Sequence, residues 1–234
     1  MINQSSITIE PIGYIKSPFS EKFTVPRQSS LVSHGEFFIH FYKPYDNPQA
    51  FMGLEEFSHI WLIFEFDKIP QKEFSPMVRP PRLGGNEQKG VFATRSPFRP
   101  NRLGLSVVKL IKVINQNNKI TLQIEGADLV DGTPIIEIKP YIKFVDSIEN
   151  AQSGFAKEAP QKLVVNFTDI ALEKINNTKI PQFKELKIDV LSQDPRPSYK
   201  KNETSDRVYG VLLYNINVLW KVKNNEIIVI DLEV

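Results

Sequence analysis

Short β-rich runs, each closed by proline, glycine or asparagine, most constrain the fold of the first 145 residues. Residues 57–66 (FSHIWLIFEF) form the most apolar run and predict a central strand buried on both faces. The tripeptide Gln116-Asn117-Asn118 is typical of a hairpin turn. The runs predicted as strands are residues 7–16, 35–42, 57–66, 105–115, 119–125 and 135–144. Six strands with this punctuation predict a β-barrel or a sandwich.

The pattern changes after a polar stretch, residues 146–160, which we interpret as a linker. Residues 161–177 carry apolar side chains at close to helical spacing, and residues 182–193 predict a second helix. Three strand-like runs follow, at residues 208–214, 216–222 and 226–234. The predicted fold class is therefore mainly β with a smaller α+β part. We expect two domains, residues 1–148 (barrel-like) and residues 160–234 (small, α+β).

Five of the eight arginines fall within the 28 residues from 78 to 105, and Glu87 is the only acid among them. Arginine suits phosphate and carboxylate because its planar guanidinium stays charged and donates in pairs. Prolines and glycines brace the segment, which predicts a binding surface for a multiply charged anion. A solvated basic loop is the alternative. The net charge is only +2, so any affinity for nucleic acid must come from such local clustering.

Several classes are excluded or disfavoured. The chain has no cysteine, which excludes disulfides, thiolate zinc sites and cysteine-ligated iron–sulfur clusters. Neither GxGxxG nor GxxxxGK[ST] occurs, so a nucleotide cofactor would not be held in a doubly wound fold. The start of the chain is polar and the longest strongly apolar run is residues 60–64. We expect a cytoplasmic protein with no membrane partner and no DNA partner.

The three histidines give weak signals. His34 and His40 are six residues apart, so they could share one face of a strand as a metal pair. No pattern of acids completes such a site, and no metal is expected. His59 lies at the edge of the apolar run, where a core histidine with a backbone partner and a ligand-binding histidine are equally compatible with the sequence.

Three further motifs place polar groups on stiff turns. They are Pro26-Arg27-Gln28, Asp128-Leu129-Val130-Asp131-Gly132-Thr133-Pro134 and Asp194-Pro195-Arg196-Pro197-Ser198-Tyr199-Lys200-Lys201. The first suits hydrogen bonding to a polar ligand, and the second suits ribose hydroxyls, an ammonium group or general-base work. The third suits an RNA loop, with phosphates on the cations and a base on the tyrosine. An exposed loop, a structural turn and a rigid interdomain turn are the respective alternatives.

Five blocks of the chain resemble the TrmO family of tRNA methyltransferases, the YaeB-like proteins. They are residues 13–28 (GYIKSPFSEKFTVPRQ), 57–66 (FSHIWLIFEF), 78–106 (VRPPRLGGNEQKGVFATRSPFRPNRLGLS), 126–142 (GADLVDGTPIIEIKPYI) and 194–199 (DPRPSY). The resemblance implies methyl transfer from S-adenosylmethionine to N6 of threonylcarbamoyladenosine (t6A), beside the anticodon of threonine tRNAs. It also implies an N-terminal β-barrel that binds the cofactor, a homodimer, and a small C-terminal domain linked to tRNA binding.

The resemblance also implies site residues. The cofactor site should include Pro26, Arg27, Gln28, His59, Ile60, Arg95, Leu105, Asp131, Gly132, Thr133 and Pro134. The tRNA-binding residues should include Arg99, Arg102, Arg196, Tyr199 and Lys200. Asp131 and His59 are the candidate catalytic bases. Methyl transfer mainly needs alignment of donor and acceptor, and the carbamoyl group acidifies the N6 proton, so a strong base is not required.

Two competing functions remain open at this level. The same arginine-bearing loops could serve a non-catalytic RNA-binding or assembly module. A phosphate-ester hydrolase ranks last, because clustered acids with histidine that could hold metal ions are lacking.

Overall fold

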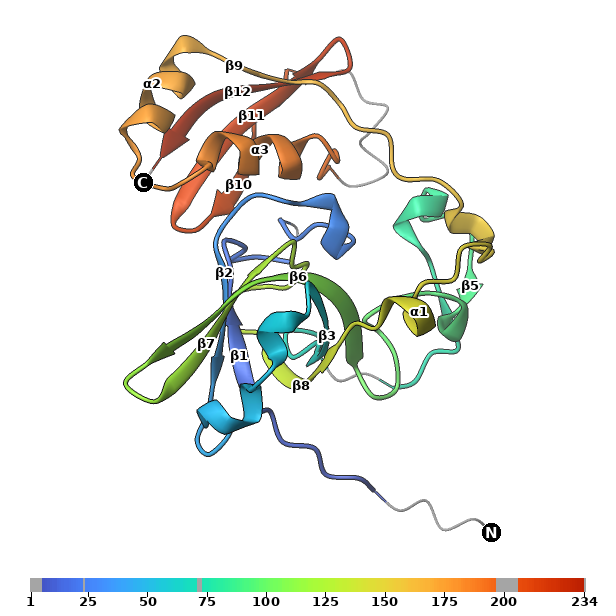
Figure 1. The fold of residues 1–234 in the computed structure, drawn as a ribbon. Helices are drawn as coiled ribbons and strands as arrows, with labels where there is room; N and C mark the ends of the chain where they lie inside the picture. Colours follow the sequence, from blue (N-terminus) through green and yellow to red (C-terminus); the bar gives the residue numbers. More distant parts are fainter. Residues whose placement is uncertain (1–5, 23, 71–72, 197–205, 234) are drawn as a thin grey trace.

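The computed structural model describes residues 6–22, 24–70, 73–196 and 206–233 (Figure 1). Its N-terminal part is a closed, antiparallel β-barrel, as predicted. The strands, in their order around the barrel, are β1 (Gly13–Lys16), β2 (Phe37–Phe41), β7 (Lys119–Glu125), β6 (Leu103–Gln116), β3 (His59–Glu65) and β8 (Pro134–Pro140). Strand β1 pairs with β8 and closes the ring.

The barrel core follows from alternation along each strand. In β3, Ile60, Leu62 and Phe64 are buried and point inward, whereas the intervening side chains are only half-buried. The expectation of a strand buried on both faces is therefore wrong, because a closed barrel encloses one face only. Trp61 on the outer face is partly covered, and its Nε1 donates to Asp146 at 3.1 Å.

Two strand boundaries differ from the sequence pattern. The run at residues 7–16 forms a strand only from Gly13, and the run at 135–144 ends at Pro140 before the single-turn helix α1 (Lys143–Asp146). The hairpin between β6 and β7 is confirmed. Asn117 and Asn118 have φ of 53° and 59°, the left-handed pair that a tight hairpin turn requires.

A long excursion leaves the barrel between β3 and β6 and carries most of the arginines (Figure 1). It contains β4 (Met77–Val78), η4 (Pro81–Leu83), β5 (Lys89–Gly90) and η5 (Val91–Ala93), and β4 pairs with β5. The other short 3-10 turns are η1 (Ser29–Leu31), η2 (Pro48–Phe51), η3 (Leu54–Glu56) and η6 (Gly154–Ala156).

The C-terminal part is a four-stranded sheet with two helices. Its elements are β9 (Val165–Phe167), α2 (Asp169–Asn177), α3 (Phe183–Leu191), β10 (Tyr209–Leu213), β11 (Ile216–Lys223) and β12 (Glu226–Glu233). The sheet order is β10-β11-β12-β9, with β9 parallel to β12. The three predicted strands and the second helix are confirmed.

The helix predicted over residues 161–177 is wrong in its first half. Val165–Phe167 pairs with Ile227–Val229 of β12, and the helix begins only at Asp169. Thr168 caps it by accepting a hydrogen bond from the Ala171 N–H at 3.2 Å.

The barrel and the C-terminal sheet share one apolar cluster. Phe19 forms a β-bridge with Leu213, and both side chains are fully buried. The Tyr214 N–H donates to the Pro18 carbonyl at 2.7 Å, and Ser20 Oγ donates to the Tyr214 carbonyl at 2.6 Å. Among the described residues, no helix is both long enough and apolar enough to cross a bilayer.

Candidate functional site

The arginine-bearing excursion forms one wall of a broad cleft of about 2600 Å³. Further lining comes from residues 152–161 and from Arg27, Gln28, Ser30 and Leu31. Its cationic residues are Lys22, Arg27, Arg79, Arg82, Arg95, Arg99, Arg102 and Lys157, and its acidic residues are Glu73 and Glu158. Pockets for small ligands usually measure roughly 300–1,000 Å³. This cleft therefore has room for a cofactor together with part of a larger anionic substrate.

Short hydroxyl-capped turns hold the arginine loop in shape. Thr94 Oγ1 donates to the Val91 carbonyl at 2.8 Å and accepts from the Ser96 N–H at 3.2 Å. Ser96 Oγ in turn accepts from the Phe98 N–H at 3.2 Å. Such side-chain bonds replace ladder hydrogen bonds in a segment without regular structure. Arg95 and Arg99 are thereby presented on an ordered loop.

The structure brings two groups of predicted cofactor residues together. The Arg95 guanidinium donates to Gln28 Oε1, so the excursion meets the Pro26-Arg27-Gln28 motif. Pro26 is buried, whereas Arg27 reaches solvent. Partial desolvation lowers the pKa of Arg27, an effect that Asp194 opposes and Arg82 reinforces. Charged groups from three separate segments therefore influence one another at this edge of the cleft.

Arg102 anchors the end of the excursion. Its guanidinium donates to Glu65 Oε1 at 2.7 Å and to the Ile69 carbonyl at 3.2 Å. Its φ of 49° lies in the left-handed region. On the other side of the cleft, Arg82 donates to the Glu158 carbonyl and joins the excursion to the linker.

The turn from Asp131 to Pro134 is braced against β1. The Asp131 carboxylate accepts from the Ser17 N–H at 3.0 Å and from Lys16 Nζ at 3.1 Å. Thr133 is buried, and its Oγ1 donates to the Val130 carbonyl at 2.7 Å. Gly132 is exposed with φ of 80°. The contacts of Asp131 are therefore those of a residue that closes a turn.

His59 lies at the opposite end of the barrel from Asp131. The His59 carbonyl accepts from the Tyr141 N–H just beyond β8, whereas Asp131 lies just before β8. A seven-residue strand spans roughly 20 Å. One chain therefore does not bring the two candidate bases together. Ile60 points into the barrel and is fully buried, and Leu105 lies outward on β6 with 53% of its surface exposed.

Asp128 belongs to the turn motif that the sequence suggested for hydrogen bonding or general-base work, but it was not among the predicted site residues. Its carboxyl accepts from Ser106 Oγ at 2.7 Å. Burial raises the pKa of Asp128, while the Ser106 hydroxyl and the charge of Arg95 act in the opposite sense. A partly buried carboxyl with a raised pKa, close enough to Arg95 to feel its charge, is the kind of group that functional sites retain. Its sequence signal was an acid between Ala127 and Leu129, both of which are buried.

Arg196 is buried in the C-terminal part. Its Nε and Nη2 donate to Asp194 Oδ1 and Oδ2 at 2.8 and 3.0 Å, a two-point pair. Arg27, Gln193, Asp194 and Arg196 help to line a smaller cavity of about 280 Å³. Because Arg27 lines both spaces, this cavity adjoins the main cleft. Tyr199 and Lys200 lie outside the described residues.

The two histidines considered as a metal pair lie in different settings. His34 Nδ1 is 2.9 Å from Asp189 Oδ2, whereas His40 on β2 stacks on Tyr14 with ring centroids 5.3 Å apart. Within the part of the chain that the structure describes, no three or more His, Asp or Glu side chains are grouped to hold a metal ion.

A closed barrel with a cationic cleft built from proline-rich loops, and without a glycine-rich phosphate loop, defines an anion-binding barrel protein outside the doubly wound class. The model of the tRNA-methyltransferase O N-terminal domain matches residues 14–147, and that of the TrmO C-terminal domain matches residues 160–234. The chain belongs to the TrmO family.

Individual relatives agree with this assignment. The tRNA (adenine(37)-N6)-methyltransferase of Escherichia coli K12 is 44% identical over 225 residues, which cover 93% of this chain and 94% of that protein. A putative S-adenosylmethionine-dependent methyltransferase, RcsF, of Pseudomonas aeruginosa is 40% identical over 216 residues, 91% of each chain. The crystal structure of TrmO from Pseudomonas aeruginosa superposes with a TM-score of 0.81 at 32% identity, covering 99% of this chain and 100% of that one.

The protein is therefore an S-adenosylmethionine-dependent tRNA methyltransferase, which confirms the class that the resemblance predicted. Family membership favours this class over the RNA-binding module and the hydrolase. The residues at the cleft fit such a cofactor, because Arg95 and Gln28 offer a guanidinium and an amide to a carboxylate.

Proposed function

We propose that the protein methylates N6 of t6A at position 37, next to the anticodon of threonine tRNAs. The observation that carries the proposal is the cleft itself, which eight cationic and two acidic side chains line. A t6A nucleotide combines a free carboxylate with phosphates, and guanidinium groups suit both. The name of the Escherichia coli relative specifies the same atom and position.

In this proposal the barrel holds the cofactor. Arg95 and Gln28 bind the methionine carboxylate, with Pro26, Arg27 and the turn from Asp131 to Pro134 close by. When bound, S-adenosylmethionine supplies a sulfonium methyl group for in-line displacement. The residues of the chain align donor and acceptor and exclude water, which accounts for most of what such a transfer needs.

A strong general base is not part of the proposal. The Asp131 carboxylate already accepts two hydrogen bonds, from Ser17 and Lys16, and His59 lies at the far end of the barrel. The carbamoyl group makes the N6 proton more acidic. Alignment therefore dominates over proton abstraction by either residue.

The two domains divide the work. Residues 1–148 bind the cofactor, and residues 160–234 contact tRNA through the segment that carries Arg196, Tyr199 and Lys200, while Arg99 and Arg102 approach tRNA from the barrel side. We propose a cytoplasmic homodimer. His59 begins β3, whereas Glu65 at the other end of β3 contacts Arg102 of the cleft, and this separation within one chain supports a site that a second copy completes.

Mass spectrometry of tRNA nucleosides tests the proposal. Threonine tRNA carrying t6A is incubated with the protein and S-adenosylmethionine, and t6A should gain one methyl group. The same transcript without the threonylcarbamoyl group is the matched control and should remain unmodified. Methylation of a different nucleoside, or none at saturating cofactor, would refute the proposed substrate.

A further inference from the structure

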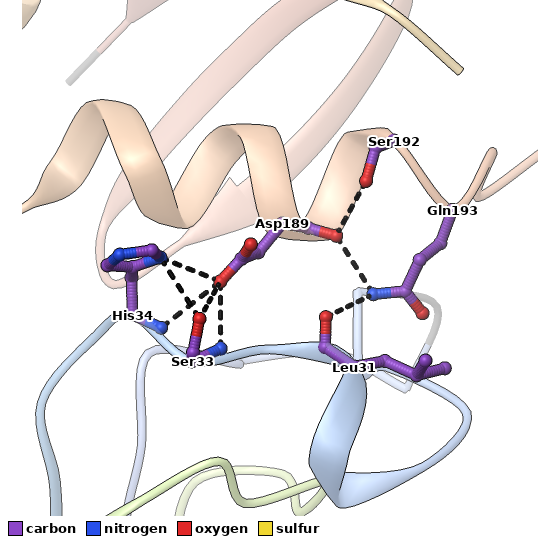
Figure 2. Close-up of polar contacts among 6 residues, drawn as sticks. All are labelled: Leu31, Ser33, His34, Asp189, Ser192 and Gln193. Carbon is purple, nitrogen blue, oxygen red and sulfur yellow. Dashed lines mark hydrogen bonds and ion pairs between the residues drawn. The ribbon is translucent and has the colours of Figure 1, made fainter. Parts of the chain in front are cut away.

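At the boundary between the domains, a carboxylate of the C-terminal domain accepts several hydrogen bonds from the barrel domain (Figure 2). Asp189 lies on α3, and its Oδ2 accepts from the Ser33 N–H at 2.8 Å and the His34 N–H at 3.1 Å. Ser33 Oγ lies 3.3 Å from the same oxygen, and His34 Nδ1 lies 2.9 Å from it. Asp189 is buried, with 8% of its surface exposed.

The next turn of the chain adds a second connection to the same segment. The Gln193 side-chain amide donates to the Leu31 carbonyl at 3.3 Å and to the Asp189 carbonyl at 2.9 Å (Figure 2). Ser192 Oγ also donates to the Asp189 carbonyl, at 3.3 Å. The end of α3 is thus joined to residues 31–34 through both side chain and backbone.

This junction, the contact of Asp189 and Gln193 with residues 31–34, connects two functional segments that we call arms. One arm bears Arg27 and Gln28, and the other bears Asp194 and Arg196. Toward the N-terminus, the Leu31 N–H donates to the Gln28 carbonyl at 3.2 Å, so the turn η1 connects the junction directly to Arg27 and Gln28. Toward the C-terminus, the Asp194 N–H donates to the Leu191 carbonyl at 2.9 Å, and the buried Asp194–Arg196 pair follows. Arg27 and Arg196 line the same small cavity.

Docking of the two domains does not by itself require such a polar cluster. The domains already dock through the buried Phe19–Leu213 bridge and its neighbouring backbone hydrogen bond. A buried carboxylate that accepts several hydrogen bonds can fix the orientation of the two domains, because charge-assisted hydrogen bonds are directional. Leaving a buried donor without its acceptor is costly. Asp189 lines neither cavity. Its effect on the reaction must therefore act through other residues.

We propose that Asp189 is a positioning residue for methyl transfer: it fixes the arm bearing Arg27 and Gln28 against the arm bearing Asp194 and Arg196. The inference rests on the proposed function, in which these arms serve the cofactor and the tRNA. Small misplacements at a transfer site reduce turnover strongly, by about 100-fold for roughly 1 Å. Turnover should depend on this junction more than binding does.

The variant Asp189→Asn tests the proposal, because it keeps the size of the side chain and removes its charge. We expect kcat to fall by about 10- to 100-fold, while KM for tRNA and the affinity for S-adenosylmethionine change by less than about threefold. Asp169→Asn, the same change at an exposed position on α2, is the matched control and should leave all three unchanged. Unchanged kcat in Asp189→Asn would overturn the proposal.

Hydrogen exchange gives a readout that needs neither tRNA nor cofactor. In Asp189→Asn, peptides covering residues 26–34 and 190–196 should exchange faster, while the barrel strands keep their protection. Unchanged exchange in both segments would overturn the proposal. If the wild-type protein did not methylate t6A, the proposed function would fail, yet exchange would still report whether Asp189 orders the two arms.

An engineered disulfide separates positioning from simple docking. The chain has no cysteine, and Ser20 and Leu212 are the sequence neighbours of the two residues in the antiparallel Phe19–Leu213 bridge. In the Asp189→Asn background, oxidised Ser20→Cys/Leu212→Cys holds the domains together away from Asp189. We expect kcat to stay low. Recovery to the kcat of the oxidised pair with Asp189 intact would show that Asp189 only holds the domains together.

A second variant serves if Asp189→Asn does not fold. His34→Gln removes one of the donors to Asp189 and leaves the carboxylate in place. We expect kcat to fall several-fold with residues 26–34 exchanging faster. Full turnover together with unchanged exchange would contradict the proposal.

Discussion

Lys187 is a buried cation on the apolar side of α3. Its Nζ donates to the Phe183 carbonyl at 2.9 Å and lies 3.0 Å from the centre of the Phe183 ring. Burial lowers the pKa of Lys187 from 10.5 to about 7, and Glu185 opposes the shift only partly. The folded state therefore binds this proton less tightly than the unfolded state does.

Lys187→Met should consequently stabilise the fold in a pH-dependent way. Between the two pKa values the unfolded chain holds more protons, so the stability of the wild type rises with pH across that window and carries the full penalty below about 7. We expect the free energy of unfolding of the variant to exceed that of the wild type by on the order of a few kcal/mol at about pH 6 and by much less near pH 10, as measured by urea denaturation. An equal gain at both pH values would contradict this explanation.

Asp128→Asn tests whether a destabilising carboxyl is retained for function. Burial raises the pKa of Asp128 above its ordinary 3.8, so the charged form costs stability above the folded pKa, and that cost disappears below the unfolded pKa. The amide can still accept from Ser106. We expect a gain of about 1 kcal/mol near neutral pH, none in acid, and at least a tenfold loss of methyl transfer. Full activity would exclude a role for the carboxylate in catalysis.

At the residue scale, the sequence predicted which motifs lie close together better than it predicted the hydrogen-bond partners of single residues. The motifs of residues 26–28 and Arg95 do meet, because both belong to loops at one end of the barrel. It did not separate the roles of Asp128 and Asp131. The contacts that each acid of the turn makes depend on the direction of its side chain, and that direction is fixed by residues distant in sequence, Ser106 for Asp128 and Ser17 for Asp131.

At the element scale, the arginine-bearing excursion should bind tRNA through charge. Arg99 is half-buried at the cleft. Arg99→Ala should weaken tRNA binding and reduce the slope of log K against log salt by about one unit, because one phosphate contact is lost. Lys119→Ala, at the β6–β7 hairpin, is the control and should leave the slope unchanged. An unchanged slope in Arg99→Ala would remove Arg99 from the tRNA surface.

A pair of variants distinguishes two roles of Arg102, anchoring the end of the excursion and binding tRNA. Glu65→Gln weakens the 2.7 Å contact that holds the end of the excursion but leaves the positive charge of Arg102 in place. If Arg102 acts as an anchor, Glu65→Gln and Arg102→Ala should both speed proteolysis of residues 73–101, and Glu65→Gln should not lower the salt slope. Normal proteolysis of both variants would contradict the anchoring role.

Element boundaries failed where pairing is non-local. The apolar spacing of residues 161–177 suited a helix, yet Val165–Phe167 joined β12, which lies more than 50 residues further along the chain. Nothing in the local sequence reveals that partner. The strands with hairpin neighbours, β6, β7, β11 and β12, were predictable because their turns, with paired asparagines of positive φ, lie beside them.

At the scale of the whole molecule, the shared apolar cluster should make the two domains unfold together. Leu213→Ala leaves a cavity at the boundary and should destabilise both parts by about 2–5 kcal/mol. The two tryptophans report separately on the unfolding of each part, since Trp61 lies on the barrel and Trp220 in the C-terminal sheet. Trp220 Nε1 has no hydrogen-bond partner among the described residues, so Trp220→Phe removes no polar contact.

Single-tryptophan variants therefore give two probes of one transition. We expect the fluorescence transitions of the two variants to coincide in urea, and Leu213→Ala to shift both equally. Separate midpoints would mean that the shared cluster does not couple the domains.

The placement of β12 between β11 and β9 also governs when the protein can assemble during synthesis. Strand β9 leaves the ribosome first but has no neighbour to pair with until Ile227–Val229 follows. At roughly 5–20 residues per second this delay lasts on the order of several seconds. The barrel has all of its strands well before then. A nascent chain would thus have a complete barrel while its C-terminal sheet still lacks β12, and a chaperone could act during that interval.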